Sequence, residues 1–408
     1  MTVLLTERHL IRPSDPRWVS IDHACWLSKN LWNYANYLRR QAFIFHHHIL
    51  SYSKLAHDLI PQSDFCALPR KVSQWVLKQL DDAWSSFFKA KQAYEQHPEL
   101  FTGEPRLPHY KAKETGRNLL VYTRQALSQP ALRRGFIQPS GLDIAIRTQQ
   151  KVDSIKQVRI IPHLDHYTVE VVYSVEAPKA KADSNGVASI DIGLNNLAAL
   201  TFNQPGAVPL LVNGRPLKAI NQWYNKQRAR LQSLLPMKQK SSHRLRRLTH
   251  RRNQRINAYL HLASRRILEE LVKCGVATLI IGKNEGWKQA IELGKVTNQN
   301  FVQIPHARFV EMLTYKAQLA GITVIETEES YTSKCSFLDL EPVTKHKQYA
   351  GKRVHRGLFR ASDGRQMNAD VNGSYNILRK VIPNAFGNGI AGAVVHPVRL
   401  HLTKQTHR

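Results

Sequence analysis

From residue 187 onward the chain alternates short apolar strands with long helical stretches, and this order constrains its fold more than any other feature. The strand patterns cover 187–192, 196–202, 209–213, 277–283 and 322–327. A long helical pattern covers about 218–272, where Pro236 is expected to separate two helices. Mixed strands with interleaved helices predict an α/β domain.

The N-terminal part has a different organisation. Residues 1–16 have an extended pattern, and strand patterns return over 119–176. Between them, residues 17–118 begin with aromatic-rich helical patterns and end in a basic stretch rich in Pro and Gly. An N-terminal β unit interrupted by a helical insert is therefore expected. The composition of 177–186 is typical of a linker, and we place the main domain boundary there.

The charge of the chain indicates a polyanionic partner. Its 408 residues include 59 Lys and Arg against 30 Asp and Glu, which gives a formal net charge of +29. This excess favours nucleic acid over an anionic membrane surface, because no strongly amphipathic lipid-facing helix stands out. No apolar run approaches the ~20 residues that span a bilayer, and the N-terminus lacks a signal-peptide pattern. An intracellular, cytoplasmic protein is expected.

One aspartate lies within a strand that otherwise reads as buried. Asp191 stands between Ile190 and Ile192 near the end of the first strand. A carboxylate in such a place is costly unless it is paired or binds a metal ion. The alternative is an ordinary turn or cap aspartate, which Gly193 makes plausible.

A second aspartate begins the last helical pattern. Asp370 stands beside Asn368, Asn372 and Asn376, which bring several polar side chains onto one short segment. Taken alone, Asp370 could be an ordinary helix N-cap. Taken with Asp191, it predicts a divalent-cation site, and in a chain this basic the substrate of that site would be a phosphodiester.

The segments that carry these residues resemble a known family. DIGLNNLAAL, VNGRPLKAINQWYNKQRARLQ, EMLTYKAQLAGITVIETEESYTSK and NADVNGSYNILRK occur in this order. The region from about 187 to 380 thereby resembles TnpB, the RNA-guided nuclease of insertion sequences and a relative of type V CRISPR effectors. The resemblance implies an RNase H-like (RuvC) nuclease domain over 185–380, in which three carboxylates hold two Mg²⁺ ions, with Mn²⁺ as an alternative. It also implies a wedge-like β-barrel formed by 1–16 and 119–180, a helical recognition lobe over 17–118 and a basic tail over 381–408.

One departure from the family concerns the middle carboxylate. The family usually has Glu directly after the strand that matches 277–281, where this chain has Gly282. We expect Glu329, or failing that Glu328, to supply the missing ligand from the end of the neighbouring strand. Glu285 could also fold back, and in the remaining alternative the protein cuts nothing.

A second departure concerns zinc. Relatives often carry two CxxC pairs in the insert that corresponds to 331–367, where this chain has Cys335 as its only thiol and Arg360 and Asp363 at the second pair. Four thiolate ligands cannot be assembled, so no structural zinc is expected. Packing of Phe337, Leu338, Leu358 and Phe359 is expected to stabilise this degenerate zinc-finger-like insert. Cys25, Cys66 and Cys274 are scattered along the chain.

The long helical region is expected to contact nucleic acid. Its arginines have no acidic partners at helical spacing, and they are Arg228, Arg230, Arg244, Arg246, Arg247, Arg251, Arg252 and Arg255. The predicted protein is an RNA-guided DNA endonuclease linked to transposition or element retention. Its expected partners are a guide RNA from the transposon end and double-stranded target DNA with a short adjacent motif, in a prokaryotic nucleoid. The alternative is a nuclease-inactive RNA-guided DNA-binding protein that acts as a repressor or accessory factor.

Overall fold

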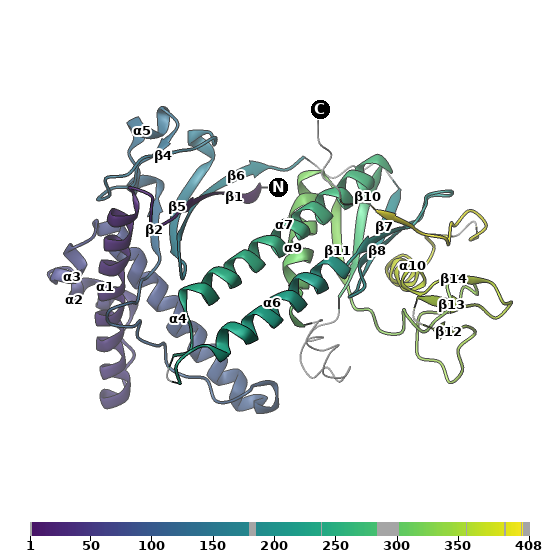
Figure 1. Ribbon diagram of the computed structural model, residues 1–408, viewed down its shortest axis with the longest axis horizontal. Coiled ribbons are helices and arrows are strands. Elements are labelled where there is room, and N and C mark those ends of the chain that lie inside the picture. The colour runs from purple at the N-terminus through teal and green to yellow at the C-terminus, as the bar shows by residue number, and fades with distance from the viewer. Residues whose placement is uncertain are drawn as a thin grey trace. The chain divides into compact units, whose positions relative to one another are not determined.

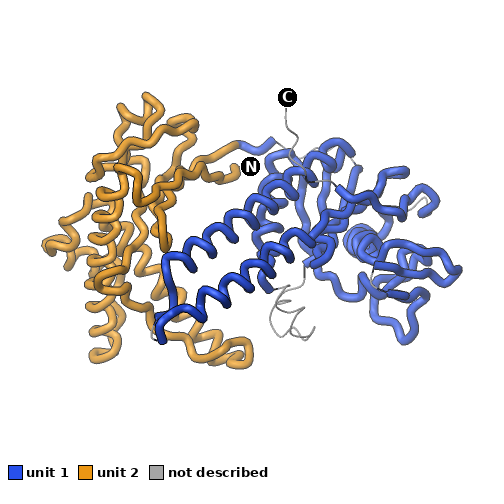
Figure 2. Tube along the Cα trace, viewed as in Figure 1, with its two compact units in different colours: residues 1, 176–408 blue, residues 2–175 orange. Residues whose placement is uncertain are grey.

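The computed structural model describes residues 2–178, 185–237, 239–283, 302–355, 357–386, 389–400 and 402. The chain divides into two compact units, which Figure 2 distinguishes by colour. The first unit comprises residues 2–175. The second comprises residue 1 and residues 176–408. No helix in the described part of the chain is long and apolar enough to cross a membrane.

The unit of residues 2–175 contains a four-stranded sheet of order β1-β6-β5-β2. Its strands are β1 (Thr2–Ile11), β2 (Leu120–Thr123), β5 (Ile155–Pro162) and β6 (Tyr167–Glu176). The short strands β3 (Phe136–Ile137) and β4 (Ile146–Arg147) form a separate pair. The sequence predicted a β-barrel, whereas the described strands form an open four-stranded sheet with β1 and β2 as its edges.

The helical insert contains two long helices and two short ones. They are α1 (Trp18–His46), α2 (Tyr52–Leu59), α3 (Ser63–Cys66) and α4 (Arg70–Gln96), and α5 (Gln129–Arg133) follows later in the chain. The buried faces of α1 and α4 join the sheet in one hydrophobic core, which includes Leu31, Trp32 and Trp84. Among the aromatic residues of α1, Tyr37 lies outside this core and is 48% exposed.

The basic stretch predicted over 101–118 lies partly along α1. Lys29 is buried, and its ammonium group donates a hydrogen bond of 2.7 Å to the carbonyl of Lys113. The side-chain amide of Asn36 donates to the carbonyl of Pro108 at 2.9 Å. Side chains of the helix thus supply the hydrogen bonds that an extended backbone needs when it is held against a protein surface.

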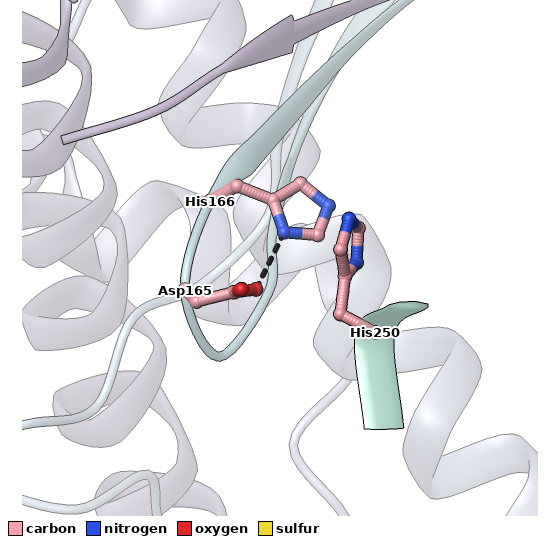
Figure 3. Close-up of side chains that lie close together, drawn as sticks. All are labelled: Asp165, His166 and His250. Atoms are coloured by element: carbon pink, nitrogen blue, oxygen red, sulfur yellow. Dashed lines mark hydrogen bonds and ion pairs between the residues drawn. The ribbon is translucent and has the colours of Figure 1, made fainter. Parts of the chain in front are cut away.

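A histidine pair orders the turn between β5 and β6. His166 forms a hydrogen bond of 2.7 Å with the Asp165 carboxylate (Figure 3). The rings of His163 and His166 stack with their centroids 4.4 Å apart. These contacts lie in the hairpin of β5 and β6, within the region 119–176 where the sequence predicted strands.

The second unit is built on a mixed six-stranded sheet of order β11-β10-β7-β8-β9-β15 (Figure 1). Its strands are β7 (Gly186–Ile192), β8 (Asn196–Phe202), β9 (Leu210–Asn213), β10 (Val276–Gly282), β11 (Thr323–Thr327) and β15 (Val398–Leu400). Strand β10 is parallel to both β7 and β11, whereas β8 is antiparallel to its two neighbours. The segment predicted as a basic tail therefore contributes an edge strand, β15, which pairs with β9.

Helices cover both faces of this sheet. Helices α6 (Arg215–Ser233) and α7 (His243–Lys273) run side by side in Figure 1, and Pro236 lies between them as predicted. Helices α7 and α9 (His306–Leu319) pack on the face that carries Ile190 and Leu279. Helix α10 (Ala369–Val381) packs on the opposite face, where Ile280 contacts Ile377 and Leu378. Because side chains alternate along a strand, Ser189 and Asp191 share the face that α10 covers.

The insert between β11 and α10 contains a small sheet of its own. Strands β12 (Lys352–His355), β13 (Leu358–Arg360) and β14 (Gln366–Asn368) pair in antiparallel order. Residues of this insert form a core with α10, and Phe337 stacks on Tyr375 with ring centroids 4.2 Å apart.

Candidate metal site and nucleic-acid interface

Three strand ends lie abreast at one edge of the six-stranded sheet. In the parallel pairing of β7 with β10, Ile190 is opposite Ile281. The next residues of the two strands, Asp191 and Gly282, therefore lie side by side near the strand ends. Gly282 in turn is opposite Thr327, the last residue of β11. The carboxyl ends of neighbouring parallel strands are a common position for functional residues in α/β proteins.

The Asp191 side chain lies directly against α10. A Cβ atom placed on Gly373 would lie 2.6 Å from Oδ2 of Asp191, closer than atoms of a real side chain approach. Glycine at 373 therefore lets the helix backbone come close to this carboxylate. Sequence reasoning did not single out Gly373, although its place three residues after Asp370 in a helical pattern was visible.

Asp370 is not the N-cap of α10. The cap is Asn368, whose side-chain oxygen accepts hydrogen bonds from the backbone amides of Asp370 and Val371, at 3.0 and 3.2 Å. The carboxylate of Asp370 makes two other contacts. Its Oδ2 accepts a hydrogen bond of 2.7 Å from the Asn196 amide, and its Oδ1 lies 3.3 Å from the Arg353 guanidinium. The ordinary capping role, which was the alternative explanation of Asp370, thus belongs to its neighbour.

Glu329 lies beside the position where the family usually has its middle glutamate. A Cβ atom on Gly282 would lie 2.8 Å from Cγ and 2.9 Å from Oε1 of Glu329. The turn that carries Glu329 is fixed by Thr332, whose amide and hydroxyl both donate to the Glu329 carbonyl, at 3.1 and 2.8 Å. The Glu329 side chain therefore fills the space that the missing side chain of residue 282 leaves.

Glu328 has a different environment. Its side chain is 61% exposed and forms an ion pair of 3.1 Å with Lys380 on α10. Lys380 also donates to the carbonyl of Glu328 at 3.0 Å, which ties the turn to the helix. Of the two glutamates considered from the sequence, the structure brings Glu329 to Gly282 and leaves Glu328 in contact with solvent. Glu285 lies outside the described residues.

The electrostatics of the cluster favour a bound cation. Burial, followed by the Glu329 and Asp370 carboxylates, raises the pKa of Asp191 well above its ordinary value, and Arg353 opposes this shift. Burial and the Glu328 carboxylate raise the pKa of Glu329 to about 7. Acids gathered in this way repel one another when ionised, and a divalent ion relieves the repulsion. An all-oxygen donor set is the one that Mg²⁺ or Mn²⁺ prefers.

A buried group of three hydroxyls fixes α10 on the sheet. The Ser189 hydroxyl donates to the Ser374 carbonyl at 2.7 Å, and the Ser374 hydroxyl donates back to the Ser189 carbonyl at 3.0 Å. The Thr201 hydroxyl lies 2.8 and 2.9 Å from those of Ser189 and Ser374. Ser189 precedes Asp191 by two residues and Ser374 follows Asp370 by four, so one set of contacts positions both carboxylates.

The asparagines that follow Asp370 do not belong to the carboxylate cluster. The Asn372 side chain accepts from the amide of Phe337 and donates to the carbonyl of Cys335, both at 2.9 Å. The Asn376 amide donates to the carbonyls of Thr332 and Cys335, at 2.9 and 2.7 Å. Both side chains therefore hold the start of the insert on α10, although they share one short segment with Asp370.

Polar contacts and packing organise the insert of 331–367. Phe337, Leu338 and Phe359 are buried together, as the sequence predicted, whereas Leu358 is half-buried. The buried Glu341 carboxylate accepts from the backbone amides of Ser336 and Ala350, at 2.8 and 3.0 Å. The buried thiol of Cys335 contacts the Thr344 carbonyl at 3.5 Å. In the described residues, Cys335 belongs to no group of three metal-binding side chains.

The helical pair α6 and α7 presents most of the predicted arginines to solvent. Residues 192–268 contain no Asp or Glu. The exposed predicted arginines are Arg228, Arg230, Arg244, Arg247, Arg251 and Arg255, whereas Arg246 is half-buried. Arg252 is engaged within the protein, because its guanidinium donates to Asn221 at 2.9 Å and to the Gln303 carbonyl at 2.7 Å. The exposed arginines are therefore available to phosphates, and Arg252 mainly joins the two helices.

Comparisons with known proteins agree with the order of these segments. The profile of OrfB_IS605, a family described as probable transposases, matches residues 170–288. The profile of the Cas12f1-like TNB domain matches residues 306–377. A TnpB-like protein of Acidianus two-tailed virus, ORF457, is 25% identical over 92% of this chain and 84% of its own length.

More distant matches include CRISPR-associated proteins. The endodeoxyribonuclease Cas12f2 of a Micrarchaeota archaeon (strain CG1_02_47_40) is 26% identical over 53% of this chain and 41% of its own length. A Cas12f1–sgRNA–target DNA complex matches 91% of this chain and 98% of its own at 12% identity, with a TM-score of 0.36. A CRISPR–Cas12f ternary complex matches 88% of this chain and 80% of its own at 11% identity, with a TM-score of 0.37.

Because both TM-scores are low, the sequence matches alone define the relationship. They make the chain, whose architecture is mixed α/β, a TnpB-like protein related to the endodeoxyribonuclease Cas12f2. The chain is thus similar to the TnpB/OrfB_IS605 family over residues 170–288, to the Cas12f1-like TNB domain over residues 306–377 and, more distantly, to Cas12f2.

Proposed function

We propose that this protein is an RNA-guided, divalent-metal-dependent DNA endonuclease of a transposable element, with Asp191, Glu329 and Asp370 as its metal ligands. The observation that carries the proposal is the position of Glu329, which lies 2.9 Å from where a Cβ of residue 282 would be. A third acid would thus take the place of the one that the chain lacks.

The three carboxylates would hold Mg²⁺ or Mn²⁺ within a RuvC-like domain. When bound, the ion activates water and stabilises the leaving oxygen of the phosphodiester. The residues around the ligands keep them in place: Asn196 orients Asp370, and Lys380 retains the turn from which Glu329 extends. Gly373 allows the approach of Asp191 to the helix that carries Asp370.

The helical pair α6–α7 would bind the phosphates of a guide RNA paired with target DNA. Its exposed arginines lie in a stretch without acids, so no acid within residues 192–268 neutralises them. Phosphate contacts of this kind bind a duplex independently of its sequence. Sequence would then be read by base pairing, with a guide RNA from the transposon end.

A basic pocket in the unit of residues 2–175 would read the short motif beside the target. It has a volume of about 550 Å³ and lies between the helical insert and the four-stranded sheet. Its wall includes four cations, two aromatic rings and two amides: Lys71, Lys78, Arg124, Lys156, Tyr52, Trp75, Gln74 and Gln125. Cations suit the DNA backbone, and side-chain amides such as Gln74 suit base edges, where adenine presents a matching donor and acceptor.

The second candidate function is RNA-guided DNA binding without cleavage, as a repressor or accessory factor. Gly282 is the observation that favours it, since the family usually has its middle carboxylate there. The two candidates share the nucleic-acid surfaces and differ only in whether Glu329 completes a working site.

A cleavage assay with a matched pair of variants separates these candidates. The protein is purified with its co-expressed RNA, and Mg²⁺-dependent cutting is measured on a plasmid library with randomised sequence beside the target. Glu329→Ala should abolish cutting, whereas Glu328→Ala, the neighbouring exposed acid, should retain most of it. Asp191→Ala should be as inactive as Glu329→Ala. Cutting that survives in Asp191→Ala or Glu329→Ala contradicts the proposed site, and target binding without cutting by the wild type supports the second candidate.

A further inference from the structure

Helix α6 exposes a tryptophan on the basic helical pair. Trp223 is 48% exposed, and it is the only tryptophan in the exposed class among those that the structure describes. A large aromatic side chain left in solvent is more informative than an exposed aliphatic one, because aromatic residues are enriched where a protein contacts a partner.

The surroundings of Trp223 are cationic. The Arg255 guanidinium lies over its ring, 5.8 Å from the ring centroid. Lys226 and Arg230 follow Trp223 on α6 by three and seven residues, and Arg251 precedes Arg255 on α7 by four. All three are exposed. Residues one or two turns apart share a helix face, so the ring lies among cations and away from acids.

The helix around Trp223 is held rigidly. The neighbouring Tyr224 is buried, and its hydroxyl lies 3.1 Å from that of Thr249 on α7. Arg252 links α7 to α6 through Asn221. These contacts fix the backbone of α6 on both sides of residue 223. The exposed ring is therefore a preformed surface on a fixed helix, which lowers the entropy cost of stacking a ligand on it.

We propose that Trp223 is a base-stacking site, which takes an unpaired nucleobase while neighbouring cations hold the adjoining phosphates. Arg255 covers one side of the indole ring, and the base stacks on the side that is open to solvent. An unpaired base is specified because the bases inside a duplex are already stacked on each other. This inference rests on the nucleic-acid binding of the proposed function but not on cleavage.

Binding in the absence of metal tests this site. The probes are two fluorescent RNA–DNA hybrids of equal length, one blunt and one with a short unpaired 3′ overhang. Anisotropy is measured with the full chain in EDTA over a series of KCl concentrations. The overhang should bind about ten-fold more tightly than the blunt end, in line with one base stacked on an aromatic side chain. Trp223→Leu should remove this preference, and Trp223→Phe should retain most of it.

The salt dependence separates stacking from electrostatic binding. Trp223→Leu should leave the slope of log affinity against log salt unchanged, whereas the control Arg251→Gln should reduce that slope by about one unit. A 2-aminopurine base in the overhang should be quenched by the wild type and less so by Trp223→Leu.

Three results would overturn the stacking site. They are equal affinity of the wild type for both hybrids, an unchanged preference in Trp223→Leu, and loss of the preference in Trp223→Phe as well while both variants remain folded. If the wild type binds neither hybrid, the nucleic-acid binding of the proposed function is also contradicted. If it binds both hybrids equally, only the stacking site is contradicted.

Discussion

The carboxylate of Glu329 occupies the space in which a side chain on Gly282 would begin, with Oε1 2.9 Å from the position of the absent Cβ. The two residues come from neighbouring parallel strands, β10 and the end of β11. Only one of the two positions can carry the carboxylate, since a side chain at 282 would collide with Glu329 and with the terminal methyl of Ile377. Whether a carboxylate at position 282 can replace the one at position 329 is therefore testable.

Moving the carboxylate back to residue 282 should restore a site that Glu329→Ala destroys. We expect Glu329→Ala to lower the cleavage rate by at least about 100-fold, because loss of even an indirect metal partner costs up to this much. Gly282→Glu alone should lower the free energy of unfolding by about 1–3 kcal/mol through overpacking. The double variant Gly282→Glu/Glu329→Ala should recover part of the activity. A double variant no more active than Glu329→Ala, although folded, contradicts the exchange.

The raised pKa of Glu329 predicts a pH-dependent stability in the absence of metal. Its pKa in the folded protein is about 7 instead of 4.5, so the fold favours the protonated form. The stabilisation is complete below the unfolded-state value and is lost as the pH rises through about 7. Urea unfolding in EDTA at pH 5 and pH 8 should therefore show a larger loss for the wild type than for Glu329→Gln. If the free energy of unfolding varies with pH in the same way for both proteins, protonation of Glu329 does not stabilise the metal-free fold.

Addition of Mg²⁺ should oppose the loss of stability that the metal-free protein shows as the pH rises. The ion binds the ionised carboxylates, so its stabilising effect should grow as the pH rises through about 7. The melting temperature with and without Mg²⁺, measured at several pH values, provides the comparison.

Arg353 provides a positive charge beside the acids when no metal ion is bound. Its guanidinium lies 3.3 Å from Asp370, and it is 44% exposed. Arg353→Gln should therefore lower the metal-free free energy of unfolding by less than about 1 kcal/mol. The same substitution should lower the Mg²⁺ concentration needed to raise the melting temperature, because a competing cation is gone. A weaker response to Mg²⁺ in Arg353→Gln would indicate that this arginine assists metal binding instead.

The insert of 331–367 should fold without zinc. Treatment with a chelator should leave the melting temperature unchanged, and Cys335→Ser should cost about 1 kcal/mol or less, because its thiol makes one weak contact with Thr344. In a zinc finger, removal of the metal unfolds the domain. Stoichiometric zinc in the purified protein, released by Cys335→Ser, would contradict this prediction.

The strands of the six-stranded sheet could be predicted from the sequence because they are short apolar runs between turn residues. The predicted 196–202 coincides with β8, and 277–283 differs from β10 by one residue at each end. The barrel over the N-terminal strands was wrong for the described strands, because sequence alternation gives the face of a residue and not whether the outer strands meet. The place of Glu329 was harder to predict than that of Asp191, since it depends on a turn beyond the strand.

The neighbours of the candidate ligands could not be predicted at all from spacing. Asn196 and Arg353 are 174 and 17 residues from Asp370 in the chain, yet both contact its carboxylate. Asn372 and Asn376 have the spacing of a polar cluster, but their partners are carbonyls of a distant loop. The direction in which such a side chain points depends on how the helix is rotated about its own axis. Packing against the sheet fixes this rotation, and residue spacing does not reveal it.

The hydroxyl contacts of Ser189, Thr201 and Ser374 set the distance between Asp191 and Asp370. This distance therefore does not depend on the insert of residues 331–367, which leads into α10. Helix α10 is aligned on the sheet by these contacts and not by the chain that leads into it. Asn372 and Asn376 hold the start of this insert on the helix, and Asn368 follows its end as the helix N-cap. The intervening residues can therefore change in length, or lose metal-binding cysteines, while Asp191 and Asp370 keep their separation.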